Sequence, residues 1–252
     1  MGLIAVAIGS ALASPAPAAQ PSVAQFGAMA GAAELSGGAE ERAADPAAAP
    51  TQVTGQVIDW VVSSRDNGRL PFIVIDKVAA AMFVFDARGQ LAGAAPALLG
   101  IASGDDSTPG IGERNLSEIG PAERTTPAGR FVARFGPAYG GHTVLWVDFA
   151  NSVAIHPVIT SNARERRAQR LASSSAEDNR ITFGCINVPA AFYRDVLEPL
   201  FSEAGGIVYI LPETRPFEDV FPRMQVASAI PQPGPPPQRV RARRTTSFSI
   251  GR

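Results

Sequence analysis

Between residues 70 and 211 the chain is a succession of short apolar runs separated by turn residues, and this pattern limits the folds open to it. The runs PFIVIDK and AAMFVFD are rich in Val, Ile and Phe, and the turn Asp86-Ala-Arg-Gly89 joins the second run to QLAGAAPALLGIA. Such runs, bounded by Gly, Pro, Asn or Asp, are typical of β-strands joined by hairpins. Further strands are expected at 129–135, 143–149, 152–156, 181–186 and 206–211.

Helices are expected at only a few places. Val53, Val57, Trp60 and Val61 have the spacing of one apolar helix face, and the ranges 189–204 and 162–172 also have helical character. This order of elements favours a mainly β domain with a few helices over repeated βαβ units. A chain of 252 residues with 46% apolar residues has ample material for the core of a single domain.

Both ends of the chain differ in composition from this domain. Residues 1–19 have the apolar stretch and small residues of a secretory signal peptide, although no basic residue precedes the stretch. Residues 20–50 are an Ala/Pro/Gly-rich linker, the folded domain is expected over 51–213, and 214–252 is expected to be a disordered Pro-rich and Arg-rich tail. We therefore expect an exported protein of the periplasm or cell envelope, with no stable membrane insertion after signal cleavage.

The net charge and the single cysteine limit what the chain is expected to bind and which covalent links it can form. A net charge of -1 gives no overall bias toward nucleic acid, and the arginines of the tail are either plain solvated residues or a contact with an anionic polymer. Cys185 is the single cysteine, so neither an internal disulfide nor an amino-terminal lipid anchor on cysteine is available. Cys185 is therefore either inert packing or a reactive thiol.

A reactive Cys185 needs a base or a cation beside it, because an unperturbed thiol with a pKa near 8.5 is about 3% ionised at pH 7. His142 follows two glycines in a turn and is interpreted as an exposed loop residue, whereas His156 ends the strand-like Val-Ala-Ile-His. His156 is therefore the better candidate base. Gly184 allows a substrate to approach the backbone beside the thiol, where N–H groups could hold an oxyanion. We expect a catalytic thiol here to have a pKa well below 8.5.

Three blocks, in order along the chain, resemble the L,D-transpeptidase catalytic domain family: Thr126-Pro-Ala-Gly-Arg-Phe131, Ala154-Ile-His156 and Arg180-Ile-Thr-Phe-Gly-Cys-Ile-Asn-Val-Pro189. The resemblance covers roughly residues 70 to 211. It implies a β-sandwich or mixed-sheet catalytic domain. It also implies that Cys185 is the nucleophile, His156 its base and Gly184 part of the oxyanion-binding turn, with the carbonyl of Pro157 orienting the imidazole.

This sequence departs from the family pattern near the cysteine. Phe183 stands where the family commonly has histidine, and Asn187 where it often has arginine, while Thr182 keeps the usual small hydroxyl. With Arg180, these residues are the candidate substrate contacts. The segment between His156 and Cys185 is longer than usual and contains Ser161-Asn-Ala-Arg-Glu-Arg-Arg-Ala-Gln-Arg170, either a solvated helix or a lid whose Arg164, Arg167 or Arg170 meets a substrate carboxylate.

The reaction implied by the resemblance is acyl transfer in peptidoglycan, within cell wall organisation and cell shape. Cys185 would attack a stem tetrapeptide, release D-alanine and pass the acyl group to an amine. The alternatives are a cross-link hydrolase or L,D-carboxypeptidase on the same site, and a non-catalytic wall-binding module. The expected partners are peptidoglycan stem peptides and not nucleic acid, the expected state is a monomer, and neither a metal nor an organic cofactor is implied.

Overall fold

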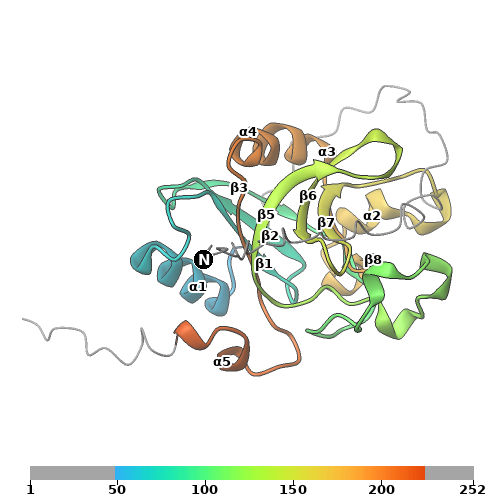
Figure 1. Cartoon of the computed structure of the whole chain (residues 1–252), viewed down its shortest axis with the longest axis horizontal. Coiled ribbons are helices and arrows are strands. Elements are labelled where there is room, and N and C mark those ends of the chain that lie inside the picture. The colour runs from blue at the N-terminus through green and yellow to red at the C-terminus, as the bar shows by residue number, and fades with distance from the viewer. Residues whose placement is uncertain (1–48, 225–252) are drawn as a thin grey trace, which may run out of the picture.

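The computed structural model describes residues 49–224. The strands in this part are β1 (Phe72–Asp76), β2 (Ala81–Phe85), β3 (Leu91–Pro96), β4 (Leu99–Gly100), β5 (Gly129–Pro137), β6 (Thr143–Asp148), β7 (Val153–Pro157), β8 (Arg180–Thr182), β9 (Ile186–Val188) and β10 (Gly206–Ile210). The helices are α1 (Gln52–Ser64), α2 (Arg167–Leu171), α3 (Ala190–Phe192), α4 (Glu198–Phe201) and α5 (Phe217–Val220). The structure is thus mainly β, as the sequence predicts (Figure 1).

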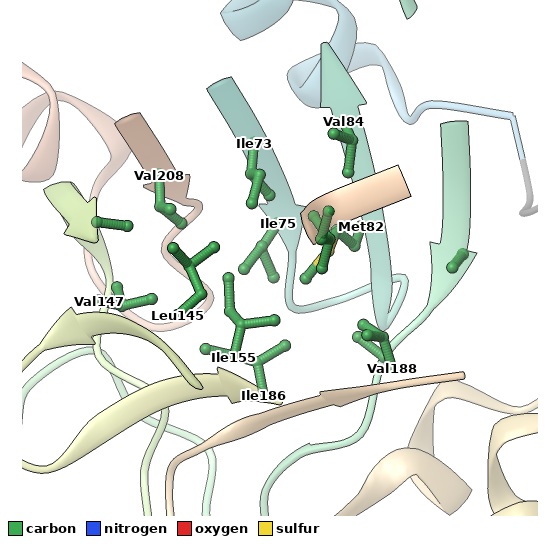
Figure 2. Close-up of a cluster of buried hydrophobic side chains, with 14 of the residues drawn as sticks. Ile73, Ile75, Met82, Val84, Leu145, Val147, Ile155, Ile186, Val188 and Val208 are labelled. Carbon is green, nitrogen blue, oxygen red and sulfur yellow. The ribbon is translucent and has the colours of Figure 1, made fainter. Parts of the chain in front are cut away.

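Eight strands form one mixed sheet in the order β3-β2-β1-β10-β5-β6-β7-β9, and β4 and β8 form a small separate pair. Strand β5 belongs to two layers, since residues 129–133 pair with β10 and residues 134–137 pair with β6. The halves of the sheet on either side of β5 therefore face one another. Figure 2 shows the result: Ile73 and Val84 point toward Ile155 and Ile186 across a shared apolar core. This is the sandwich of a mixed sheet expected from the sequence.

The central strands are buried on both faces, which explains their unbroken apolar sequence. In β1, Ile73 and Ile75 belong to the core between the layers, whereas Phe72 and Val74 belong to a second core with Val57 and other residues under α1 and α5. Successive side chains of a strand point to opposite faces, so a strand covered on both sides needs apolar residues at every position. The segment from α3 to α4 covers the first core with Phe192, Leu197 and Phe201.

Helix α1 contains the four residues that the sequence places on one apolar helix face. Thr51 caps the helix by accepting a hydrogen bond from the Thr54 N–H at 3.3 Å, and Arg65 ends it in a left-handed conformation. Val57 and Val61 are buried, but Val53 is 45% exposed. The apolar face is therefore narrower than the sequence pattern suggested, because Thr54 takes the first inward position and donates to Asp76 at 2.7 Å.

Three expectations differ from the structure. The strand expected at 181–186 is broken at residues 183–185, where the chain turns at Gly184 with a φ of 130°. The helix expected at 162–172 is interrupted at Arg166, whose φ is 51°. The fold also continues beyond residue 213, since Phe221 is buried against the core under α1.

The proposed signal peptide, almost all of the linker and the tail beyond residue 224 lie outside the described residues. Within the described range, no helix has the length and apolar character needed to cross a membrane.

Candidate active site

Strands β7 and β9 bring the candidate nucleophile and base together. They pair in parallel, with Ile155 opposite Ile186 and His156 opposite Asn187. The two isoleucines face the core, so alternation along each strand turns His156 and Asn187 to the other face. Cys185 lies two residues before Asn187 and faces the same side. All three residues line one pocket.

Cys185 is held in its neutral form. Its Sγ donates to the carbonyl oxygen of Ser152 at 3.4 Å, which requires the thiol proton to be present. Burial raises the pKa of the Cys185 thiol, and this effect outweighs a backbone contact at Ala154 and the positive charge of Arg167, which act in the opposite direction. The low thiol pKa expected for a catalytic cysteine is therefore absent from this state of the site.

His156 is also uncharged at neutral pH. Its Nδ1 lies 2.9 Å from the carbonyl oxygen of Pro157, and a carbonyl only accepts, so Nδ1 carries the proton. Nε2 consequently has the lone pair, which accepts a hydrogen bond from Nδ2 of Asn187 at 3.0 Å. Burial lowers the pKa of His156 to about 4, against a raising contribution from the Pro157 carbonyl and with lowering contributions from Arg167 and His142.

Gly184 shapes the turn that presents the thiol. A side chain at this position would meet the Thr125 carbonyl oxygen at 2.7 Å, and the φ of 130° is itself strained for other residues. The Gly184 N–H donates to Thr182 Oγ1 at 3.1 Å, and the Thr182 hydroxyl donates to the Cys185 carbonyl at 2.6 Å. The Gly184 N–H would therefore have to leave Thr182 before it could hold an oxyanion.

Thr126 connects this turn to a buried charge cluster. Its hydroxyl donates to the Gly184 carbonyl at 2.9 Å and accepts from the Gly100 N–H at 2.9 Å. Its own carbonyl accepts from Lys77 Nζ at 2.9 Å, and Lys77 also pairs with Asp105 at 2.7 Å. Although burial opposes ionisation of Asp105, hydrogen bonds from Lys77, Thr214 and two backbone N–H groups hold its pKa well below the usual range. The turn is thus fixed to the scaffold by ionised groups.

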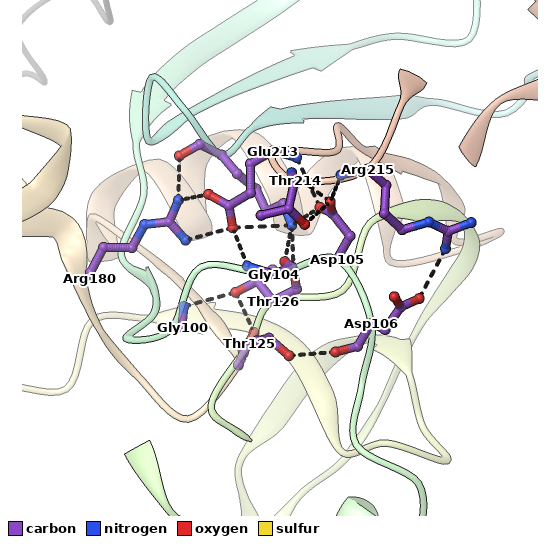
Figure 3. Close-up of polar contacts among 12 residues, drawn as sticks. Gly100, Gly104, Asp105, Asp106, Thr125, Thr126, Arg180, Glu213, Thr214 and Arg215 are labelled. Carbon is purple, nitrogen blue, oxygen red and sulfur yellow. Dashed lines mark hydrogen bonds and ion pairs between the residues drawn. The ribbon is translucent and has the colours of Figure 1, made fainter. Parts of the chain in front are cut away.

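Arg180 belongs to this cluster and does not line the pocket. Its guanidinium pairs with Glu213 (Figure 3). The guanidinium also donates to the Lys77 carbonyl at 3.0 Å, and Arg180 is absent from the residues that line the pocket. The structure therefore separates Arg180 from the other candidate substrate contacts. Thr182, Phe183 and Asn187 do line the pocket. The ring of Phe183 lies against the Arg124 guanidinium, with 3.8 Å from Cζ to the ring centroid, so this position carries a cation–π contact in place of a histidine.

The loop between residues 103 and 125 forms an apolar wall of the pocket. Ile111 and Ile119 are buried there, and Leu116 lines the same wall. Polar residues also line the pocket, among them Asn151, Ser152 and Arg167. Such a mixture of apolar surface and a few converging polar groups is typical of a small-molecule or peptide site. Among residues 49–224, no cluster of three or more His, Cys, Asp or Glu side chains is arranged to hold a metal ion.

Sequence reasoning placed Cys185 and His156 but assigned no part in the site to Ser152 or Thr126. The Ser152 contact is made by a backbone carbonyl at a residue with a φ of 57°, and no side-chain pattern indicates it. Thr126 lies in the first of the three motif blocks, which is the available signal. The sequence offers Arg167 either as a residue of a solvated helix or as a lid residue that meets a substrate carboxylate. Its buried bond to Asn187 fits neither description and depends on the path of the chain between β7 and β9.

Comparison with known proteins returns structural neighbours alone. No family model matches this chain, and no curated protein matches it. The L,D-transpeptidase catalytic domain from E. faecium has 20% identity and a TM-score of 0.31, with 56% of this chain and 95% of that chain covered. The L,D-transpeptidase from Xylanimonas cellulosilytica has 14% identity and a TM-score of 0.33 over 56% of this chain and 60% of that one. The helical cell shape determining protein Pgp2 from Campylobacter jejuni has 11% identity and a TM-score of 0.37 over 66% and 58%.

Proposed function

We propose that this protein is an exported cysteine acyltransferase of the L,D-transpeptidase type that acts on peptidoglycan stem peptides. The observation that carries the proposal is the register of β7 and β9, which directs the side chains of Cys185 and His156 into the same pocket. Two uncharged partners suit a mechanism in which the base removes the thiol proton as the thiol attacks. The three motif blocks supply the substrate class.

In the proposed reaction, Sγ of Cys185 bonds to the carbonyl carbon of the residue before the terminal D-alanine. The thiol proton moves to Nε2 of His156, which first exchanges its hydrogen bond from Asn187 for one from the thiol. The tetrahedral intermediate collapses, the C–N bond breaks, and the imidazolium returns the proton to the departing D-alanine amine. An amine of a second stem then attacks the thioester carbonyl carbon. The C–S bond breaks, the amine proton passes through His156 to the Cys185 thiolate, and the products are a cross-link and the free thiol.

Intact-protein mass spectrometry tests the proposal. We expect a carbapenem or a tetrapeptide muropeptide to add one acyl group to the purified protein, and Cys185→Ser to abolish the adduct. His156→Gln should slow acylation by about a hundredfold or more, since general base catalysis typically contributes that much. Alkylation by iodoacetamide reports the thiolate and is expected to be slow at pH 7, because burial raises the Cys185 pKa. A folded wild-type protein that forms no adduct would support the wall-binding module.

The products distinguish ligation from hydrolysis. Incubation with muropeptides should give dimers that lack one D-alanine. Tripeptides or monomers alone would indicate the carboxypeptidase or cross-link hydrolase, which uses the same acyl-enzyme with water as acceptor.

A further inference from the structure

A series of hydrogen bonds reaches His156 from the crossover between β7 and β9, residues 158–185, and the proposed reaction gives it no role. Arg167 Nη1 donates to Asn187 Oδ1 at 2.7 Å, and Asn187 Nδ2 in turn donates to His156 Nε2 at 3.0 Å. Arg167 and Asn187 are both buried. Nε of Arg167 pairs with Glu165, so the guanidinium is held on two sides.

This series of hydrogen bonds allows only one orientation of the Asn187 amide. If the amide were turned over, its NH2 group would face the N–H groups of Arg167, and its oxygen would face the lone pair of Nε2. Neither hydrogen bond could then form. The same orientation leaves the proton of His156 on Nδ1, where the Pro157 carbonyl accepts it.

We propose that Arg167 is a positioning residue for the acyl transfer: acting through Asn187, it fixes the tautomer of His156 and keeps Nε2 unprotonated. The assignment rests on the proposed function for its catalytic meaning. The effect of Arg167 on the tautomer and protonation state of His156 does not depend on the proposed function. A lysine or arginine that only met a substrate carboxylate would leave this imidazole unchanged.

The charges around His156 are consistent with this role. Arg167 on α2 and His142 before β6 both disfavour a second proton on the imidazole, and Cys185 faces it as a neutral thiol. Glu165 lies behind Arg167 and pairs with its Nε. An imidazolium would need an acceptor at Nε2, and the Asn187 oxygen is held away by Arg167.

The test is an NMR titration of the His156 imidazole in the full-length protein. The chain has two histidines, so the signal lost in His156→Gln identifies the one of interest. In the wild type, we expect the Nδ1–H tautomer and a titration midpoint near 4. Asn187→Asp places a carboxylate at Nε2 and should raise the midpoint by about one pH unit or more. Arg167→Gln should raise it as well, and Arg167→Lys should restore the wild-type value.

Arg164→Gln is the matched control, because Arg164 lies on the same crossover, carries the same charge and is exposed. It should leave the midpoint unchanged. A midpoint in Arg167→Gln equal to that of the wild type would overturn the proposal, whatever Asn187→Asp shows. If Arg167→Gln fails to fold, Asn187→Leu is measured instead, because it removes the amide through which Arg167 acts; a raised midpoint is expected, and a midpoint equal to that of the wild type would overturn the proposal. The titration needs no substrate, so absence of acylation with a shifted midpoint would contradict the proposed function while supporting the role of Arg167.

Discussion

Cys185 and His156 are each held in the uncharged form by the same cause, which is removal from water. The Ser152 carbonyl keeps the thiol proton and the Asn187 amide occupies the imidazole lone pair, so the two residues are neighbours that do not yet share a proton. The reactive arrangement differs from this one by the exchange of two hydrogen bonds.

Burial of His156 should make the protein less stable in mild acid. The unfolded chain gains a proton as the pH falls below 6.5, whereas folded His156 gains one only near pH 4. The free energy of unfolding should therefore fall across this window, by at most about 3 kcal/mol from this residue, since one pKa unit is worth about 1.4 kcal/mol. Urea denaturation at pH 7 and pH 4 measures the effect.

His156→Gln should lose this part of the pH dependence, and His142→Gln, at an exposed position, should keep it. An identical pH dependence in wild type and His156→Gln would show that the folded protein protonates this imidazole as readily as the unfolded chain does.

At the scale of elements, Lys77 joins three segments that are far apart in the sequence. Directly after β1, it contacts Asp105 in the pocket-wall loop and the Thr126 carbonyl before β5. Lys77→Met should lower the free energy of unfolding by about 3 kcal/mol, because it leaves the buried Asp105 carboxylate without its cationic partner. Chemical denaturation provides the measurement.

Arg194→Met supplies the comparison for Lys77, since the Arg194–Asp195 pair is mostly exposed. Its effect should stay below about 1 kcal/mol. Equal losses in the two variants would mean that the Lys77 cluster contributes no more than a surface pair. Lys77→Met should also slow acylation of Cys185, because Thr126 connects Lys77 to the Gly184 turn.

The elements were largely predictable, and their ends were not. The segments that form β1, β2 and β10 have apolar residues at nearly every position, which is the pattern of strands buried on both faces. The break at Gly184 depends on the Thr125 carbonyl, a contact made across the fold and invisible to local pattern. The pairing of Cys185 with His156 followed from motif order, whereas the hydrogen bonds that neutralise both residues depend on the register of β7 and β9.

For the whole molecule, the second core extends past the carboxyl end of the predicted domain. Phe221 is 5% exposed and lies 6.4 Å from Tyr209 between ring centroids. Phe221→Ala should lower the free energy of unfolding by about 3 kcal/mol, the usual cost of truncating a buried aromatic side chain, and Phe221→Leu by less. Thermal denaturation followed by circular dichroism tests this, and an unchanged melting temperature in Phe221→Ala would place the segment outside the cooperative unit.

Strand β5 is shared by both layers of the sandwich, with one half hydrogen-bonded to each. One layer cannot slide over the other without bending this strand and breaking its ladder. The two layers must therefore move together as one rigid body. Any widening of the pocket entrance for a bulky polymer has to come from the connecting segments around the pocket, those between residues 103 and 125 and between β7 and β9.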